Sequence, residues 1–350
     1  MATIGGRLVA QGNSGCVFTP ALHCKYKKYD QKPVKGEQLL TKLTSEYDAT
    51  LEYTISTIIR GIPLWKNYFS PPLSMCVPST EQTEKDLKDC KPLEKAPISK
   101  FRLLPLTDAG LQIFRYKFSS NTFDMMNFFT HLISAGALLA LFGIVHTDLH
   151  MGNIMVDKHT IPRIIDFNLA IIKEQVTLHD ITHVYGVLWS QESPDATLMN
   201  GVAHGHKPSS IIPSIILKKP IMKQIRSVLG ITNETMIEQL EQFAATSTAI
   251  TSGDVLGWFN AYWRTIDSWG IGAVITHLLA DFSTTPGFVP IIMKHRPQLI
   301  PLLRRMCAVS PVQRIDCVQA LYYLDPNHFI IRKYGKAWLD KVGTGNIRTA

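Results

Sequence analysis

Three side chains that carry oxygen ligands stand close together along the chain. Asp148 and Asn153 flank a short loop in the run HTDLHMGN, and Asp166 follows in IDFN. The apolar runs 154–156 and 163–165, joined by a polar turn, predict a hairpin that returns Asp166 to the other two. Mg²⁺ binds carboxylate and amide oxygens, and it completes its shell with water and substrate phosphate. The pattern therefore predicts phosphoryl transfer, which needs a metal, correct positioning and a group that orients the nucleophile.

These two segments resemble the catalytic loop and the metal-binding motif of protein kinases, HRDxxxxN followed by DFG. The interval from Asp148 to Asn153 is five residues, as in that motif. Residues 267–272 (DSWGIG) are similar to the DxWSxG that opens a buried helix of the C-terminal lobe, and Arg314 is similar to the late arginine of that lobe. The resemblance covers residues 8–325. The kinase pattern is truncated and divergent here, which is similar to kinases of large DNA viruses.

The resemblance implies a role for each residue of the loop and of the metal motif. Asp148 would accept or orient the proton of the attacking hydroxyl, and Asn153 and Asp166 would hold Mg²⁺ against the phosphates of ATP. His146 would be structural. The acceptor would be a serine or threonine hydroxyl in a protein substrate.

The N-terminal part supplies the nucleotide contacts that the resemblance implies. Lys42 would contact the ATP phosphates and pair with a glutamate on the following helix, with Glu52 as first choice and Glu46 as second. Glycines let backbone N–H groups approach phosphates, and residues 10–17 resemble GxGxxGxV. The phosphate loop and the adenine site would then use Ala10, Gly12, Gly15, Val17, Leu104 and Leu106.

Strand-like segments come first and helical ones later, which predicts an α+β fold of two lobes. We expect strands within residues 4–19 and at 38–43 and 101–106, and a helix over 45–59 with Leu51, Ile55, Ile58 and Ile59 on one side. A second helix should cover 122–142, and the chain should be mainly helical from about residue 212. The predicted domains are a β-rich N-lobe over 1–105, a helical C-lobe over 106–330 with an insertion at 198–260, and a tail over 331–350.

Several residues depart from the kinase pattern. Thr147 replaces the arginine that often receives an activation-loop phosphate, which suggests activity without that switch. Asn168 replaces the glycine of DFG, which keeps a pseudokinase scaffold open as an alternative. His150 stands where protein kinases often have lysine, and HxDLHxxN also resembles aminoglycoside and choline kinases, a second alternative. Asp195, in SPD, would stand for the glutamate of APE and pair with Arg314.

Composition narrows the partners and the location. Hydrophobic residues make up 45% and charged residues 18%, as in an ordinary globular protein. The net charge of +8 fits a solvated basic loop near Lys25 to Lys35, and nothing in the chain indicates a nucleic-acid or membrane partner. A chain of this length needs no disulfide staples, so its six cysteines indicate a reducing compartment. Residues 79–97 read as an exposed polar insertion. We expect an intracellular protein, and for a viral chain the host cytoplasm or the virion; oligomeric state stays open.

Overall fold

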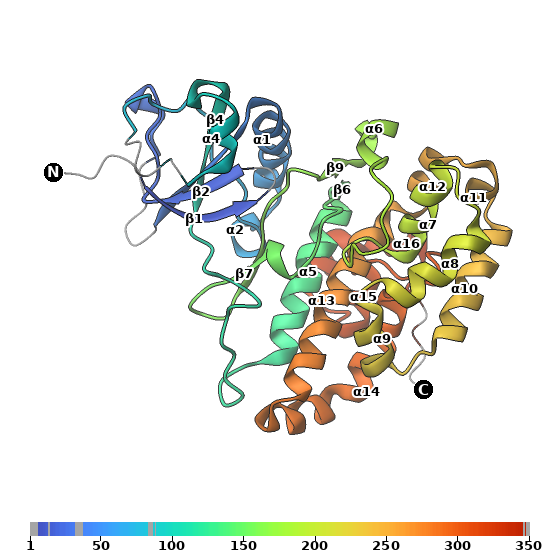
Figure 1. Cartoon of the computed structure of the whole chain (residues 1–350). Coiled ribbons are helices and arrows are strands. Elements are labelled where there is room, and N and C mark those ends of the chain that lie inside the picture. The colour runs from blue at the N-terminus through green and yellow to red at the C-terminus, as the bar shows by residue number, and fades with distance from the viewer. Residues whose placement is uncertain are drawn as a thin grey trace. The chain divides into compact units, whose positions relative to one another are not determined.

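The computed structural model describes residues 6–12, 15–31, 38–82, 87, 89–345 and 347, and the chain divides into two compact units. The first unit comprises Met1–Gly110 and Arg163–Asn168, and the second comprises Leu111–Pro162 and Leu169–Ala350. The N-terminal part holds a four-stranded antiparallel sheet and the C-terminal part is mostly helical (Figure 1). This confirms the α+β class predicted from the sequence.

The sheet of the first unit has the order β1-β2-β3-β4. Its strands are β1 (Arg7–Gly12), β2 (Gly15–Thr19), β3 (Leu39–Ser45) and β4 (Phe101–Thr107). Lys42 of β3 lies opposite Val17 of β2 on one side and Leu104 of β4 on the other. Helix α1 (Glu46–Gly61) follows β3 without a loop, and the Ser45 side chain caps it by accepting from the Asp48 N–H. Helix α1 packs on β3 and β4, so β3 and α1 carry Lys42 and Glu52 on adjoining elements.

The apolar side predicted for α1 is buried only in part. Leu51 and Ile58 are 42% and 36% exposed, whereas Ile55, Ile59 and the charged Glu52 are buried. Of the four residues predicted on one side of this helix, two are therefore buried and two are exposed. Helical periodicity of apolar residues locates a buried face from apolar side chains alone. In α1 the carboxylate of Glu52, paired with Lys42, occupies part of the buried face.

Two disulfides cross-link the first unit, contrary to the expectation that this chain needs none. Cys16 pairs with Cys90 and Cys24 pairs with Cys76, while Cys307 and Cys317 are buried thiols. The four bonded cysteines lie in an apolar cluster with Phe18, Leu43 and Leu103. Chain length indicates how much a protein needs disulfides on average. It does not show how large a hydrophobic core the small first unit can form on its own.

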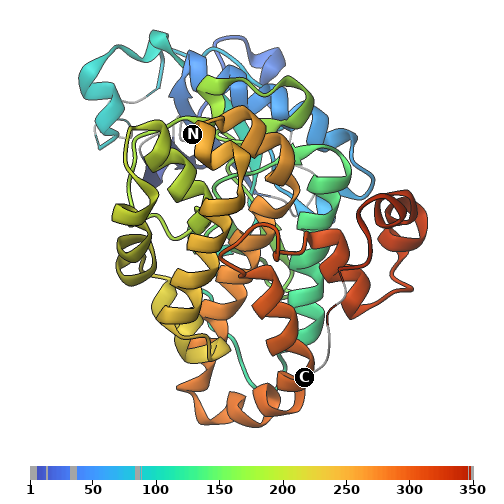
Figure 2. The same ribbon diagram turned by 90° about the vertical axis from the view of Figure 1, so that its right-hand side faces the viewer.

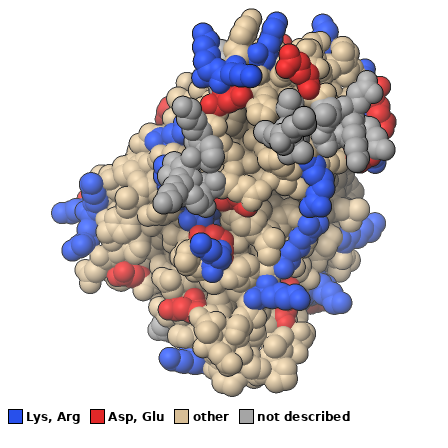
Figure 3. Space-filling view, turned by 90° about the vertical axis from the view of Figure 1, so that its left-hand side faces the viewer, with Lys and Arg blue, Asp and Glu red and all other residues tan. Residues whose placement is uncertain are grey.

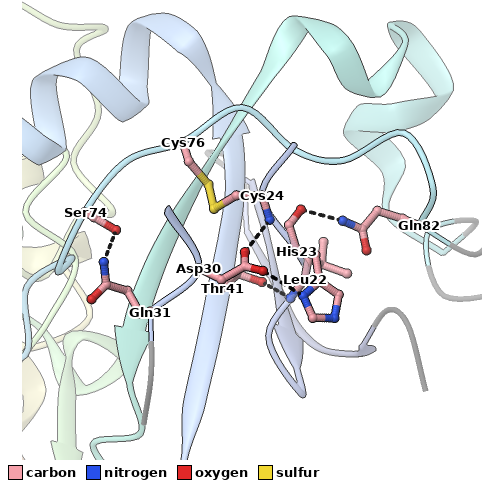
Figure 4. Close-up of a disulfide and its surroundings, with 9 residues drawn as sticks. All are labelled: Leu22, His23, Cys24, Asp30, Gln31, Thr41, Ser74, Cys76 and Gln82. Carbon is pink, nitrogen blue, oxygen red and sulfur yellow. Dashed lines mark hydrogen bonds and ion pairs between the residues drawn. A yellow bond between two sulfur atoms is a disulfide. The ribbon is translucent and has the colours of Figure 1, made fainter. Parts of the chain in front are cut away.

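The segment around Cys24 is tied down by polar contacts as well (Figure 4). The Cys24 N–H donates to Asp30 Oδ1 at 2.7 Å, and Gln82 Nε2 donates to the carbonyl of His23 at 2.7 Å. Gln31 Nε2 donates to Ser74 Oγ at 3.0 Å. The described part of the predicted basic loop is thus anchored to residues 74–82, and Lys32 and Lys35 of that loop lie outside the described residues. The insertion predicted as exposed has a buried anchor, because Cys90 is fully buried.

The second unit is built on four packed helices, α5 (Met125–Leu141), α13 (Ile266–Ser283), α14 (Val289–Met306) and α15 (Cys317–Leu324). Helix α5 packs on α13 and α15, and α13 packs on α14; Figure 2 shows the orange α13 beside the green α5. Asp124 caps α5 by accepting from the Asn127 N–H. Strand β5 (Leu111–Gln112) pairs with β7 (Ile154–Val156), and β6 (Ile144–Val145) pairs with β9 (Ile171–Ile172). The run of successive helices begins with α7 (Pro194–Ala203), earlier than the predicted residue 212, and the predicted tail includes a helix.

The remaining elements complete the chain. In the first unit they are α2 (Trp65–Tyr68) and α4 (Lys91–Lys95), and β8 (Pro162–Ile164) crosses the division. Those of the second unit are α6 (Leu178–Ile181), α8 (Pro208–Lys218), α9 (Met222–Leu229), α10 (Asn233–Thr246), α11 (Thr248–Ser252), α12 (Val255–Tyr262) and α16 (Lys336–Val342).

Two surface features bear on the partners expected from composition. Within the described residues, no helix is both long and apolar enough to span a bilayer. On the face in Figure 3, acidic side chains lie among the basic ones, with uncharged surface between them. The basic side chains of that face are therefore dispersed over several places.

Candidate active site

Lys42 is the centre of a buried ion cluster in the first unit. Its Nζ lies 2.8 Å from Glu52 Oε2 and 2.6 Å from Asp166 Oδ1. The side chains of Lys42 and Glu52 are 8% and 2% exposed, and that of Asp166 is 29% exposed. The structure places Lys42 beside Glu52 and not beside Glu46, which pairs with Arg102. One ammonium thus holds two carboxylates from distant parts of the sequence.

Charge and burial compete in this cluster. Burial alone would lower the pKa of Lys42, but the carboxylates of Glu52 and Asp166 outweigh it and raise that pKa above its ordinary value. Burial raises the pKa of Glu52, against the opposing charge of Lys42. Lys42 is therefore firmly cationic, which suits a group that binds phosphate oxygens.

Asp166 is held in an unusual backbone conformation. Its φ is 63°, in the left-handed region that non-glycine residues rarely adopt. The neighbouring Phe167 is fully buried and lies edge-on to Phe69, and the Ile164 carbonyl accepts from the Ser70 N–H at 3.0 Å. Such strained positions persist where the surroundings fix them, and they are common at functional sites. The packing on both sides of Asp166 thus directs its carboxylate to Lys42.

Asp148 and Asn153 form a second group, in the second unit. Asn153 Nδ2 donates to the backbone carbonyl of Asp148 at 2.9 Å and to its Oδ2 at 3.0 Å. Asn153 is 6% exposed and ends the short 3₁₀ turn Met151–Asn153 that closes the loop. Neither bond uses Asn153 Oδ1, which leaves an amide oxygen for a hard cation.

His150 lies beside Asp148 in a fixed orientation. Its Nδ1 accepts from the Gly152 N–H at 2.9 Å, so the neutral ring carries its proton on Nε2, which lies 3.6 Å from Asp148 Oδ2. A Cβ at Gly152 would come within 2.6 Å of the His150 ring. Glycine at position 152 therefore makes room for the ring that faces Asp148.

The surroundings of Asp148 favour its ionised form. Burial alone would raise the pKa of Asp148, but the hydrogen bond and charge of His150, the charge of His146 and a hydrogen bond from Gln191 together lower it. An ionised Asp148 can accept a hydrogen bond from a hydroxyl and orient it for attack.

Asp267 anchors the loop that carries Asp148. Its Oδ2 accepts from the His146 N–H at 2.8 Å and its Oδ1 from the Thr147 N–H at 3.1 Å. Thr147 has a φ of 64°, and its side chain donates to the Leu169 carbonyl at 2.9 Å. The loop conformation before Asp148 therefore depends on a buried carboxylate from α13.

Gly270 lets α13 approach the same loop. A Cβ at position 270 would lie 2.7 Å from Leu149 Cβ and 2.9 Å from its carbonyl oxygen. The sequence resemblance includes Asp267 and Gly270 in DSWGIG, but it did not predict what they contact. Glycine in a buried helix was the available signal, because it often marks a close approach.

The glycine-rich segment is described on both sides of its turn. Ala10 lies opposite Val17 and Gly12 opposite Gly15, while residues 13–14 lie outside the described residues. At Gly15 a Cβ would lie 2.2 Å from the Leu43 carbonyl, so the β2–β3 pairing requires glycine there. A Cβ at Gly12 would meet nothing within 4 Å. Cys16 follows directly and is bonded to Cys90, so it carries no free thiol while the bond is intact.

The predicted adenine contacts lie on neighbouring strands. Leu104 and Leu106 are on β4, opposite Lys42 and Leu40 of β3. Leu104 is fully buried and Leu106 is half-buried. Val17, opposite Lys42 on β2, is also half-buried. Val17, Lys42 and Leu104 thus lie in register across three strands.

A fully buried ion pair joins Asp195 of α7 to Arg314, which lies between α14 and α15. Arg314 Nη2 lies 2.6 Å from Asp195 Oδ1, and neither side chain is exposed. This confirms the predicted Asp195–Arg314 pair. Trp258 Nε1 donates to the second oxygen of Asp195 at 3.2 Å, so the pair is structural.

The predicted site residues therefore fall into two groups. Lys42, Glu52 and Asp166 meet in the first unit, and Asp148 and Asn153 meet in the second. The convergence of Asp166 with Asp148 and Asn153 stays a prediction. Within the described residues, no three His, Cys, Asp or Glu side chains gather as a metal site.

The comparisons add no relative. No protein-family model matches the chain, and a search of curated proteins finds no match. The kinase resemblance therefore depends on the residues and contacts given above.

Proposed function

We propose that the chain is an ATP- and Mg²⁺-dependent phosphotransferase of the protein-kinase type, with a two-lobed kinase-like fold. The observation that carries the proposal is Lys42 between Glu52 and Asp166, at 2.8 and 2.6 Å. Kinases need a strand lysine paired with a helix glutamate, together with the aspartate of the metal motif. Here the three residue types occupy β3, α1 and the IDFN segment, in that chain order.

The roles follow from the charges and contacts of each group. Lys42, kept cationic by two carboxylates, binds phosphate oxygens of ATP. Asp148, kept ionised by its surroundings, orients the acceptor hydroxyl, and Asn153 fixes its carboxylate. Mg²⁺ would neutralise charge developing on the transferred phosphate, and the carboxylate of Asp166 and the Oδ1 of Asn153 fit it as hard oxygen donors.

A protein hydroxyl is the favoured acceptor. The support is the DSWGIG segment with the Asp195–Arg314 pair, both of which resemble protein kinases and not the aminoglycoside or choline enzymes. The preference for serine or threonine depends on the same resemblance.

The test is transfer of label from γ-labelled ATP with Mg²⁺. Wild type is compared with Asp166→Ala, using generic protein acceptors in one series and amino sugars or choline in the other. We expect labelled serine and threonine with wild type and background with Asp166→Ala. Equal background signal in both proteins would overturn the enzyme and leave a binding scaffold, and label on small acceptors alone would overturn the substrate class.

A further inference from the structure

Five residues of the second unit form a closed ring of contacts: His183, Trp189, Glu192, Thr197 and Lys219. The ring of His183 stacks on Trp189 at 5.0 Å between centroids, and His183 Nε2 lies 2.6 Å from Glu192 Oε1. Thr197 Oγ1 donates to Glu192 Oε2 at 2.6 Å. Lys219 Nζ donates to Thr197 Oγ1 at 3.0 Å and to the Trp189 carbonyl at 2.6 Å. Lys219 therefore joins the two ends of the ring.

Burial of Lys219 carries a desolvation cost for its ammonium group. It follows α8 within residues 198–260, and it is 1% exposed. Burial lowers its pKa to about 8, while the nearby carboxylates of Glu192 and Asp195 raise it in opposition. Asp195 forms an ion pair with Arg314, and Glu192 contacts His183. The contacts of Lys219 thus offset part of the cost of desolvating its ammonium group.

The segment that Lys219 holds also contacts Asp148. Gln191 lies between Trp189 and Glu192, and its side chain hydrogen-bonds to Asp148. The Ser190 carbonyl accepts from Trp269 Nε1 at 3.1 Å. Residues 189–192 are thus fixed to Lys219, to α13 and to Asp148 at successive positions.

We propose that Lys219 is a positioning residue that holds residues 183–197 in the arrangement which presents a protein substrate to Asp148. This role rests on the proposed function, because it assigns residues 183–197 to substrate binding. Glu192 supplies a built-in negative charge next to Lys219 and His183, where a phosphorylated residue would otherwise be needed to order such a segment. A fixed charge at Glu192 agrees with the residue at position 147, where threonine replaces the arginine that would bind such a phosphate.

The experiment compares Lys219→Met with the matched control Lys218→Met, since Lys218 is the exposed neighbour in sequence. Hydrogen exchange of amides 183–192 is measured without substrate, and Michaelis constants are measured for ATP and for a protein acceptor. We expect faster exchange and a KM for the protein about tenfold higher in Lys219→Met, with the KM for ATP changed less than about twofold. Lys218→Met should match wild type in every measurement. Should Lys219→Met fail to fold, Glu192→Gln, which removes charge and keeps shape, takes its place with the same expectations.

The outcomes separate this role from the proposed function. Faster exchange with a raised KM for the protein alone supports it. Unchanged exchange, or faster exchange with an unchanged KM, overturns the role of Lys219 while wild type remains an active enzyme. An inert wild type overturns the proposed function and this role together.

Discussion

Lys42 Nζ lies 2.8 Å from the carboxylate of Glu52, and both side chains are almost completely buried. Removing one member of a buried pair leaves an unpaired charge and costs about 3–5 kcal/mol. Lys42→Met should therefore lower the free energy of unfolding by about that amount, measured by urea denaturation. The double variant Lys42→Met/Glu52→Leu should recover much of the loss, because no lone carboxylate remains at Glu52. Lys100→Met, on an exposed lysine of the same unit, serves as control; a double variant no more stable than Lys42→Met would contradict this account.

His150 should control the protonation of Asp148. The hydrogen bond and charge of His150 help to hold the pKa of Asp148 below its usual range, so the ionised form persists until the pH falls through that lowered value. In His150→Ala the pKa should rise, and the acid limb of kcat/KM should move to higher pH. The exposed His159→Ala is the control. Profiles of wild type and His150→Ala that superimpose would show that His150 does not act on Asp148.

Asp267 should be needed for the loop before Asp148. In Asp267→Ala the N–H groups of the buried His146 and the half-buried Thr147 lose their acceptor, at about 1–3 kcal/mol for an unsatisfied buried group. Thr147 would then leave its left-handed conformation. We expect lower stability to urea and a fall in kcat of about 10²-fold, as when a catalytic group is misplaced. Asp281→Ala, on an exposed aspartate of the same helix, should leave both unchanged; a full kcat in Asp267→Ala would refute the anchoring role.

Reduction should destabilise the first unit. Cys16–Cys90 and Cys24–Cys76 close loops with sequence separations of 74 and 52 residues, and a disulfide stabilises by about 2–4 kcal/mol. A reducing agent should lower the melting temperature of wild type, and the Cys24→Ser/Cys76→Ser variant should show part of that shift before reduction. Mass spectrometry without reductant should find both cross-linked peptides. Four alkylated thiols at these positions in freshly purified protein would count against the pairing.

Lys219 should make stability depend on pH in the alkaline range. Its pKa is lowered to about 8 from 10.5, so between these values the unfolded chain binds more protons than the folded one. The contribution of Lys219 to the free energy of unfolding therefore rises with pH, by about 3 kcal/mol from pH 8 to 10.5. The free energy of unfolding of wild type, taken relative to that of Lys219→Met, should rise by that amount over this range. Relative to that of Lys218→Met it should stay constant. A constant difference for Lys219→Met would mean an unperturbed lysine.

The strands and the loop motif could be predicted because their signals are local. The strand expected at 38–43, the helical spacing over 45–59 and the interval from Asp148 to Asn153 each depend on a few adjacent residues. The choice of Glu52 as partner of Lys42 needed only one helix and one strand. The inner face of α1 was missed because a buried glutamate breaks the apolar period.

The long-range contacts had no readable signal in a single chain. The pairing of four cysteines cannot be deduced from their spacings. The ring closed by Lys219 joins residues 183, 189, 192, 197 and 219, and a lysine after an apolar helix reads as a surface residue until its burial is known. Asp267 and Gly270 were recognised by motif, but their contacts with residues 146–149 come from the packing of α13.

The most direct test of the central claim is the rate of γ-phosphate transfer by Asp148→Asn, which keeps the size of the side chain, next to wild type. With saturating ATP, Mg²⁺ and a protein acceptor, wild type should turn over and Asp148→Asn should be slower by about 10²- to 10⁴-fold. Its affinity for ATP with Mg²⁺ should stay close to that of wild type. Equal turnover by the two proteins would contradict the assignment of Asp148, and with it the account of this site.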